Sequence, residues 1–348
     1  MTKLLLFTAA CFVLLLLNGA HHVVEGRPHR ERRNDYMLFV LGDSYADVGN
    51  RPQTSEKTVL SRAWFYPYGI SDSAHGNRPT GRVSDGMVQS DILAKILGGD
   101  ESPPPSRRHW RDSDKVDPSG VNFAVGGAGV LSDDRAAPSL GQQVDQLASL
   151  ISSGAVETAD LDRSVALVAI STGADYNGRI THESSSRDMT ALTGQVTDEL
   201  VAAVRRLRDL GVTKVLVNLL PALGCMPWQS VASNYATCDS HSNALASMHN
   251  AALRRRLHDS YDDVLLLDLY SIFSNSVQPN VGPCCRNPDP NGYCGQDDSS
   301  GRPHYSVCDN PDQAFFWDYM HPTQAGWETI MQQLQGPIQD FLGIQSSW

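Results

Sequence analysis

After residue 17 the 348-residue sequence lacks any apolar run long enough to span a membrane. The one long run, residues 4–17, covers fourteen apolar or small residues, which is short of the roughly 20 residues that a spanning helix needs. Lys3 precedes this run, and Asn18-Gly19-Ala20 follow it, in the order typical of a secretory signal peptide. We therefore expect residues 1–20 to be a signal peptide, with an uncleaved anchor as the alternative. The remaining chain is expected to be secreted, without a stable membrane span.

Positive charge is also scarce. The chain has 28 Lys and Arg residues against 39 Asp and Glu residues, a formal net charge of −11, and loss of the signal peptide would remove only Lys3 and leave −12. An acidic surface repels phosphate backbones, so we expect no nucleic-acid partner. The one basic cluster, Arg27–Arg33, lies in the segment 21–34, which we interpret as a flexible, solvated terminus rather than a binding arm.

The sequence has seven cysteines, and one of them, Cys11, lies in the expected signal peptide. An even set of six remains, which indicates disulfides in an oxidising compartment. Cys225 and Cys238 flank one loop, and we expect them to pair. The other four are expected to form two bridges among themselves: Cys284, Cys285, Cys294 and Cys308. A zinc site built from that group and His304 is the alternative, although its spacing matches no familiar zinc finger.

Short runs of β-branched and aliphatic residues recur along the chain. They are nearly continuous in apolar character rather than alternating, which is typical of parallel strands covered on both faces. The predicted strands are Tyr36–Gly42, Gly120–Ala124, Val165–Ser171, Lys214–Leu219 and Val264–Asp268. Helical spacing between them is clearest over Leu192–Leu207 and from Asn243 to Leu257. The alternation predicts a single α/β domain over residues 35–348, with a doubly wound sheet.

Candidate functional residues follow three of the predicted strands. Ser44 follows the first strand, Gly126 and Gly127 follow the second, and Asp175 follows the third. Ligands of such sheets collect at the carboxyl ends of the strands, so we expect these residues to meet at one rim. Polar segments rich in Pro, Gly, Ser and Asp are interpreted as insertions around that rim: Arg51–Arg82, Asp100–Pro118 and Pro279–Gln313.

Ser44 could act as a nucleophile if a base accepts its proton, and the base works best when a carboxylate orients it. His321 and Asp318 fit these two roles, since a spacing of three places them on one side of a turn or helix start. Pro322 and Thr323 suit the first turn of a closing helix, which we predict over Gln324–Leu334. The alternative for Asp318 and His321 is an ordinary helix-entry pair.

The glycine-rich run Asn122–Gly129 would bring backbone N–H groups close to the rim without side chains in the way. Donors aimed at a developing oxyanion usually make the largest catalytic contribution. A phosphate-binding loop is one alternative, but the spacing is neither Gly-x-Gly-x-x-Gly nor a Walker pattern with lysine. Tight packing of a helix on a strand is the other alternative.

With these blocks in this order, the chain resembles the plant GDSL esterase/lipase family of the SGNH hydrolases. The resemblance spans nearly all of the mature chain and is carried by Gly42–Ser44, Pro79–Gly86, Gly120–Ala128, Leu220–Cys225 and Phe316–Thr323. It implies a flavodoxin-like three-layer α/β/α sandwich with a five-stranded parallel sheet. It also implies a triad of Ser44, Asp318 and His321 that needs no cofactor and no metal.

By the same resemblance, the N–H groups of Ser44 and Gly127 are two oxyanion donors, and Gly126 is less suited to that role. The family's third block reads Gly-x-Asn-Asp, and its asparagine is the third donor. Here the donor position is Ala174, and Thr172 replaces the glycine. Asn177 or a hydroxyl of the substrate could substitute for the missing donor. Tyr45, where the family has leucine, is interpreted as a minor variation.

The resulting prediction is a secreted serine carboxylic-ester hydrolase of the apoplast or cell wall, and a monomer. Its substrate would be an acetylated cell-wall polysaccharide or a lipid ester. Two alternatives stay open: an acyltransferase that uses the same triad, and a binding or defence protein weakened by Ala174. Four aromatic residues of an early loop are interpreted as packing that loop on the sheet, with stacking on sugars or cover for an acyl chain as the alternative: Trp64, Phe65, Tyr66 and Tyr68.

Overall fold

The computed structural model describes residues 36–107, 115–131, 137–258, 261–277, 279, 281–289 and 291–344. All of them fall within one compact unit, Asn34–Trp348. The predicted signal peptide, residues 1–20, and the basic segment 21–34 lie outside the described residues. Within the described residues, no helix is both long and apolar enough to cross a bilayer.

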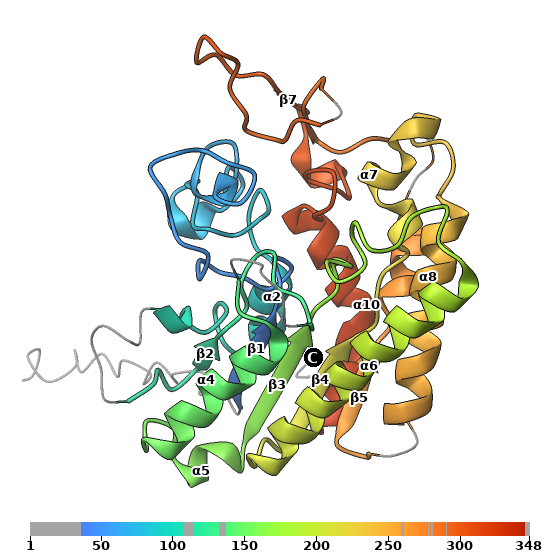
Figure 1. Ribbon diagram of the computed structural model, residues 1–348. Coiled ribbons are helices and arrows are strands. Elements are labelled where there is room, and N and C mark those ends of the chain that lie inside the picture. The colour runs from blue at the N-terminus through green and yellow to red at the C-terminus, as the bar shows by residue number, and fades with distance from the viewer. Residues whose placement is uncertain are drawn as a thin grey trace, which may run out of the picture. The chain divides into compact units, whose positions relative to one another are not determined.

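The fold is built on a five-stranded sheet in which every neighbouring pair of strands is parallel (Figure 1). Its order, β2-β1-β3-β4-β5, is that of flavodoxin-like doubly wound sheets. The strands are β1 Met37–Gly42, β2 Gly120–Asn122, β3 Ser164–Ala169, β4 Lys214–Asn218 and β5 Val264–Leu267. All five predicted strands are confirmed, and their ends agree with the prediction to within two residues.

Helices cover both faces of the sheet. They are α2 Gln89–Ile96, α4 Leu140–Ser152, α5 Thr158–Leu161, α6 Ser186–Asp209, α7 Pro227–Ser230, α8 Ser240–Leu253, α9 Leu269–Ser276 and α10 Gln324–Leu342. Helix α6 packs against both α4 and α8 in front of the strands, whereas α10 lies behind them and packs against α2 and α9 (Figure 1). This arrangement confirms the predicted three-layer α/β/α sandwich. Because both faces are covered, every residue of β1 and β3 is buried.

The predicted helical segments are present, but two end differently from the prediction. Helix α8 passes into one π turn, Arg254–His258, at its C-terminal end. Helix α10 continues past the predicted end at Leu334 to Leu342. It does so although Pro337 cannot donate a backbone hydrogen bond, because Ile338 and Leu342 extend the buried apolar stripe of the helix.

Two of the predicted insertions pack on each other. The first, 51–82, contains the 3-10 turns η1 Arg62–Trp64 and η2 Ser73–His75. The last, 279–313, contains an antiparallel pair, β6 Cys285–Arg286 and β7 Ser306–Val307, and the turn η6 Pro311–Gln313. Short 3-10 turns also flank α7: η3 Leu223–Cys225 and η4 Val231–Ser233. A second hydrophobic cluster joins the two insertions: Ala63, Tyr68, Val83, Cys284, Cys285, Cys294 and Trp317.

The early aromatic residues mostly pack, as predicted, but against other loops rather than the sheet. Tyr68 is fully buried, and its ring meets Trp317 edge to face with 6.0 Å between the ring centroids. The indole of Trp64 donates to the carbonyl of Arg51 over 2.8 Å. Tyr66 differs, since 63% of it is exposed.

Candidate active site

Ser44 leaves the carboxyl end of β1 in a turn fixed by the residues on either side of it. A Cβ atom on Gly42 would come within 2.6 Å of the carbonyl oxygen of Ala169, so only glycine lets β1 approach β3 this closely. The Asp43 carboxylate accepts hydrogen bonds from the backbone N–H groups of Tyr45, Ser171 and Thr172. Burial nevertheless raises the pKa of Asp43. Asp43 thus ties the loop after β1 to the loop after β3.

The turn that carries Asp318 and His321 brings both side chains to Ser44. The Ser44 Oγ lies 2.8 Å from the Nε2 atom of His321, and the Nδ1 atom of His321 lies 2.7 Å from the Oδ1 atom of Asp318. The same Oδ1 atom accepts the backbone N–H groups of Met320 and His321, each over 2.9 Å. Thr323 caps the helix that follows, as its side chain accepts from the N–H group of Gly326. The local spacing therefore fixes the orientation of the carboxylate toward the imidazole.

Tyr45 supports the same turn. It is fully buried, its hydroxyl donates to the carbonyl of Met320 over 3.1 Å, and its ring meets Trp327 edge to face with a centroid separation of 4.9 Å. The centroid of the His321 ring lies 5.9 Å away. Tyrosine in place of leucine thus adds a hydrogen bond between the turn after β1 and the turn of Asp318, so the variation is structurally larger than the sequence suggested.

The second oxygen of Asp318 contacts two residues, Arg62 and Tyr68, that the sequence analysis did not assign to the site. Oδ2 accepts a hydrogen bond from the Tyr68 hydroxyl over 2.9 Å. The same atom forms an ion pair with the Nη2 atom of Arg62 over 3.3 Å. Burial alone would raise the pKa of Asp318, but attraction to His321 and Arg62 outweighs burial and holds the pKa well below its ordinary range. No local pattern marks either residue, because more than 200 residues separate the loop from Asp318.

The glycine loop after β2 presents one of its two candidate N–H groups to the site. The N–H group of Gly126 donates to the Oδ2 atom of Asp47 over 2.8 Å, so it is already engaged. Gly127 has a φ of +83°, which favours glycine, and its N–H group has no hydrogen-bond acceptor among the described residues. The N–H group of Ser44 likewise has no hydrogen-bond acceptor among the described residues. These observations support the expected preference for Gly127 over Gly126.

The loop after β3 places Ala174 at the cavity. Asp175, the next residue, is buried and accepts the backbone N–H groups of Val130 and Leu131 over 2.8 and 3.0 Å, which fixes the loop against the chain after β2. Ala174 and the exposed Asn177 both line the same cavity as Ser44. The methyl group of Ala174 offers no hydrogen-bond donor.

The triad and the ends of the loops after β1, β2 and β3 border a cavity of about 480 Å³. Its lining includes Ser44, Gly126, Gly127, Thr172, Ala174, Asn177, Asp318 and His321. The loops that follow β1, β2 and β3 therefore meet at one rim of the sheet, as predicted. Apolar side chains form much of the remaining wall: Val59, Leu60, Val83, Trp228 and Met320. Val59 and Leu60 are 50% and 52% exposed, so they form an open, apolar edge.

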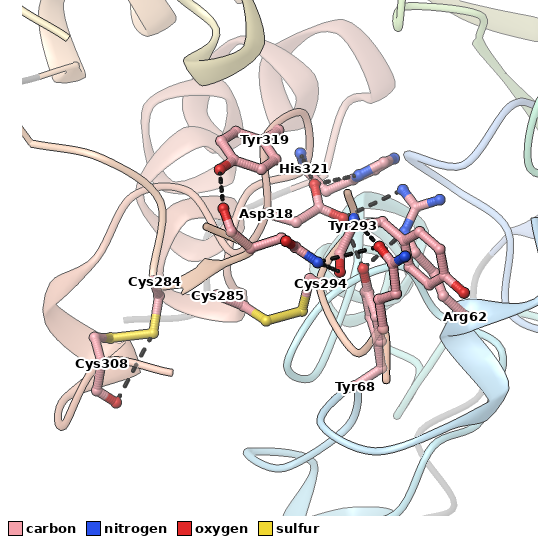
Figure 2. Close-up of a disulfide and its surroundings, with 12 residues drawn as sticks. Arg62, Tyr68, Cys284, Cys285, Tyr293, Cys294, Cys308, Asp318, Tyr319 and His321 are labelled. Carbon is pink, nitrogen blue, oxygen red and sulfur yellow. Dashed lines mark hydrogen bonds and ion pairs between the residues drawn. A yellow bond between two sulfur atoms is a disulfide. The ribbon is translucent and has the colours of Figure 1, made fainter. Parts of the chain in front are cut away.

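A disulfide fixes one wall of this cavity. Cys285 pairs with Cys294 (Figure 2). Cys294 and the adjacent Tyr293 line the cavity. The other bridges join Cys225 to Cys238 and Cys284 to Cys308. The predicted pairing is confirmed, and the alternative zinc site is wrong because its cysteine sulfurs are bonded to one another. Within the described residues, no group of three or more His, Cys, Asp or Glu residues could hold a metal ion.

Comparison with known proteins identifies the family. Residues 38–334 match the family described as GDSL-like Lipase/Acylhydrolase. GDSL esterase/lipase At5g03610 of Arabidopsis thaliana is 34% identical, over 95% of this chain and 94% of its own. GDSL esterase/lipase At3g09930 of the same plant is 30% identical, over 95% of both chains.

Among solved structures, an extracellular lipase from Streptomyces rimosus is 14% identical, over 85% of this chain and 98% of its own, with a TM-score of 0.37. The family match over most of the chain and the two plant relatives agree with each other. The chain belongs to the GDSL-like lipase/acylhydrolase family and is thus one of the carboxylic ester hydrolases.

Proposed function

We propose that the protein hydrolyses carboxylic esters through an acyl-enzyme intermediate on Ser44. The observation that carries the proposal is the continuous chain of contacts from Ser44 through His321 to Asp318, with distances of 2.8 and 2.7 Å. Distances of this size allow a proton to pass from a hydroxyl to an imidazole while a carboxylate keeps the imidazole in place.

In the proposed first step, the Oγ atom of Ser44 bonds to the ester carbonyl carbon, and its proton passes to the Nε2 atom of His321. The intermediate then collapses, and the leaving alkoxide takes that proton and departs as the alcohol. Water repeats the sequence on the acyl-enzyme, which releases the acid and returns the proton to Ser44. Asp318 stays a carboxylate throughout and accepts a hydrogen bond from the Nδ1–H group of His321.

The negative charge that develops on the carbonyl oxygen would be stabilised by hydrogen bonds from the N–H groups of Ser44 and Gly127. Their lack of any other acceptor among the described residues supports this role. Position 174 would supply the third donor, but alanine has none. Losing one oxyanion donor typically lowers turnover by about a hundred- to a thousandfold. Enzymes commonly accelerate reactions by about a millionfold or more, so two donors are compatible with a working enzyme.

The apolar wall suggests what kind of ester would bind. Val59, Leu60 and Trp228 line the cavity beside the triad, and the volume of about 480 Å³ exceeds what an acetyl group needs. We infer that the acyl group is an apolar chain or ring, as in a lipid ester. A secreted location is part of the proposal, and the three disulfides support it because such bonds persist in oxidising compartments.

The test compares wild type with Ser44→Ala on a series of p-nitrophenyl esters from acetyl to dodecanoyl, and on acetylated xylan. Ser149→Ala is a matched control, because Ser149 is exposed on α4. We expect wild type and the control to hydrolyse the longer esters best, and Ser44→Ala to lose at least a thousandfold of the activity. Equal activity of wild type and Ser44→Ala would refute the mechanism, and a preference for acetylated xylan would refute the choice of substrate.

A further inference from the structure

The carboxylate of Asp318 is held on both sides, and the second side belongs to the early insertion, residues 51–82. Figure 2 shows Arg62 and Tyr68 pointing toward Asp318. The Nε atom of Arg62 also donates to the Tyr68 hydroxyl over 2.7 Å. Since a guanidinium can only donate, the hydroxyl must accept from Arg62 and give its own proton to Asp318. The direction of each hydrogen bond in this chain is therefore fixed.

These contacts are shielded from water. Tyr68 is fully buried, and only 16% of the Arg62 side chain and 4% of the Asp318 side chain are exposed. Arg62 is anchored a second time, because its Nη1 atom donates to the carbonyl of Val59 on the cavity wall. Charges in such a poorly solvated place interact more strongly than they would at the surface.

Arg62 and His321 share one carboxylate. In the reaction, Asp318 stabilises the positive charge that His321 gains with its proton. Arg62 contacts the other oxygen of the same carboxylate, so one oxygen of Asp318 is held by His321 and the other by the early insertion. Among the described residues, His321 and Arg62 are the two cationic side chains paired with Asp318.

We propose that Arg62 and Tyr68 are positioning residues of the ester-hydrolysing site: together they hold the Oδ2 atom of Asp318, so that its Oδ1 atom faces the imidazole of His321. The inference rests on the proposed function. Both residues act through Asp318, so their loss should lower turnover and leave substrate binding nearly unchanged.

The experiment measures kcat and KM separately for wild type, Arg62→Gln, Arg62→Lys and Tyr68→Phe. Arg78→Gln is the matched control, because Arg78 is exposed in the same insertion. Arg62→Gln and Tyr68→Phe should each lower kcat by about tenfold with little change in KM, since each loses a hydrogen bond to the charged Asp318. Arg62→Lys should restore part of the loss, because it keeps a cationic donor beside Asp318.

A second readout does not need turnover. The proton between the Nδ1 atom of His321 and Asp318 gives an NMR signal that can be assigned by its loss in His321→Ala. This signal should move in Arg62→Gln and Tyr68→Phe and stay in place in Arg78→Gln. An unchanged kcat or an unchanged signal in the folded Arg62→Gln and Tyr68→Phe variants would overturn the proposal. If wild type itself proves inactive on esters, the proposed function fails, while the NMR signal still decides whether the two residues position Asp318.

Discussion

Replacing Ala174 with asparagine should raise ester turnover, because it would return a donor to the third oxyanion position. The backbone there is already fixed, since Asp175 accepts two N–H groups from the loop after β2. Ala174 is only half-buried at the cavity, so a larger side chain can enter the cavity without displacing the core. The substitution therefore changes the chemistry of the site more than its packing.

The size of the effect follows from two opposing terms. Removing one oxyanion donor from an enzyme costs about 2.7 to 4 kcal/mol, which is the ceiling for the gain. Ordering the new side chain costs about 0.5 to 1.5 kcal/mol. The net gain is about 2 kcal/mol in the transition state, or about 30-fold in kcat. KM should change little, because the donor meets a charge that develops only in the transition state.

The assay is steady-state hydrolysis of one good p-nitrophenyl ester by wild type and Ala174→Asn. Ala202→Asn on the exposed side of α6 is the control for the substitution itself. Asn177→Ala is made in both backgrounds. If Asn177 already replaces the missing donor, its loss should lower turnover in wild type and have little effect in Ala174→Asn. A folded Ala174→Asn variant with wild-type turnover, and no effect of Asn177→Ala, would refute the reasoning.

Two further predictions concern stability and the cavity wall. Burial opposes ionisation of Asp91, but a buried ion pair with Arg82 at 2.7 Å outweighs it and lowers the pKa of Asp91. Its stabilisation is therefore full above about pH 4 and is lost as the pH falls further. Urea unfolding should show Asp91→Asn to be less stable by about 3 kcal/mol at pH 7 and by clearly less at pH 3, and an equal difference at both pH values would contradict this. Replacing Cys285 and Cys294 by serine should cost about 2 to 3 kcal/mol in thermal unfolding and raise KM more than it lowers kcat, and an unchanged KM would show that the bridge does not hold the cavity wall.

Much of the fold could be predicted from sequence because buried parallel strands leave a local trace. The runs around Phe39, Val168 and Val217 are apolar at every position, since helices cover both faces of the sheet. The end of α10 was predicted wrongly because it depends on contacts that leave no local trace in the sequence. Pro337 is a strong local signal for a helix end, and the burial of Ile338 and Leu342, which outweighs it, depends on tertiary packing.

The site was predictable where its parts are local and unpredictable where they are not. His321 follows Asp318 by three positions, so one turn sets their geometry. Arg62 lies in an irregular loop without periodicity, and its contact with Asp318 depends on how two insertions pack around Tyr68 and Trp317. The hydroxyl of Tyr45 likewise gained its partner, Met320, only in the folded chain.

The most direct test of the account is labelling with a fluorophosphonate, which reacts only with an activated serine hydroxyl. The wild-type protein should gain the mass of one phosphonyl group, and peptide mapping should find it on Ser44. His321→Ala should abolish the labelling, because the base is gone. Absence of label in the folded wild-type protein, or label on any other serine, would contradict the claim that Ser44 is activated by His321.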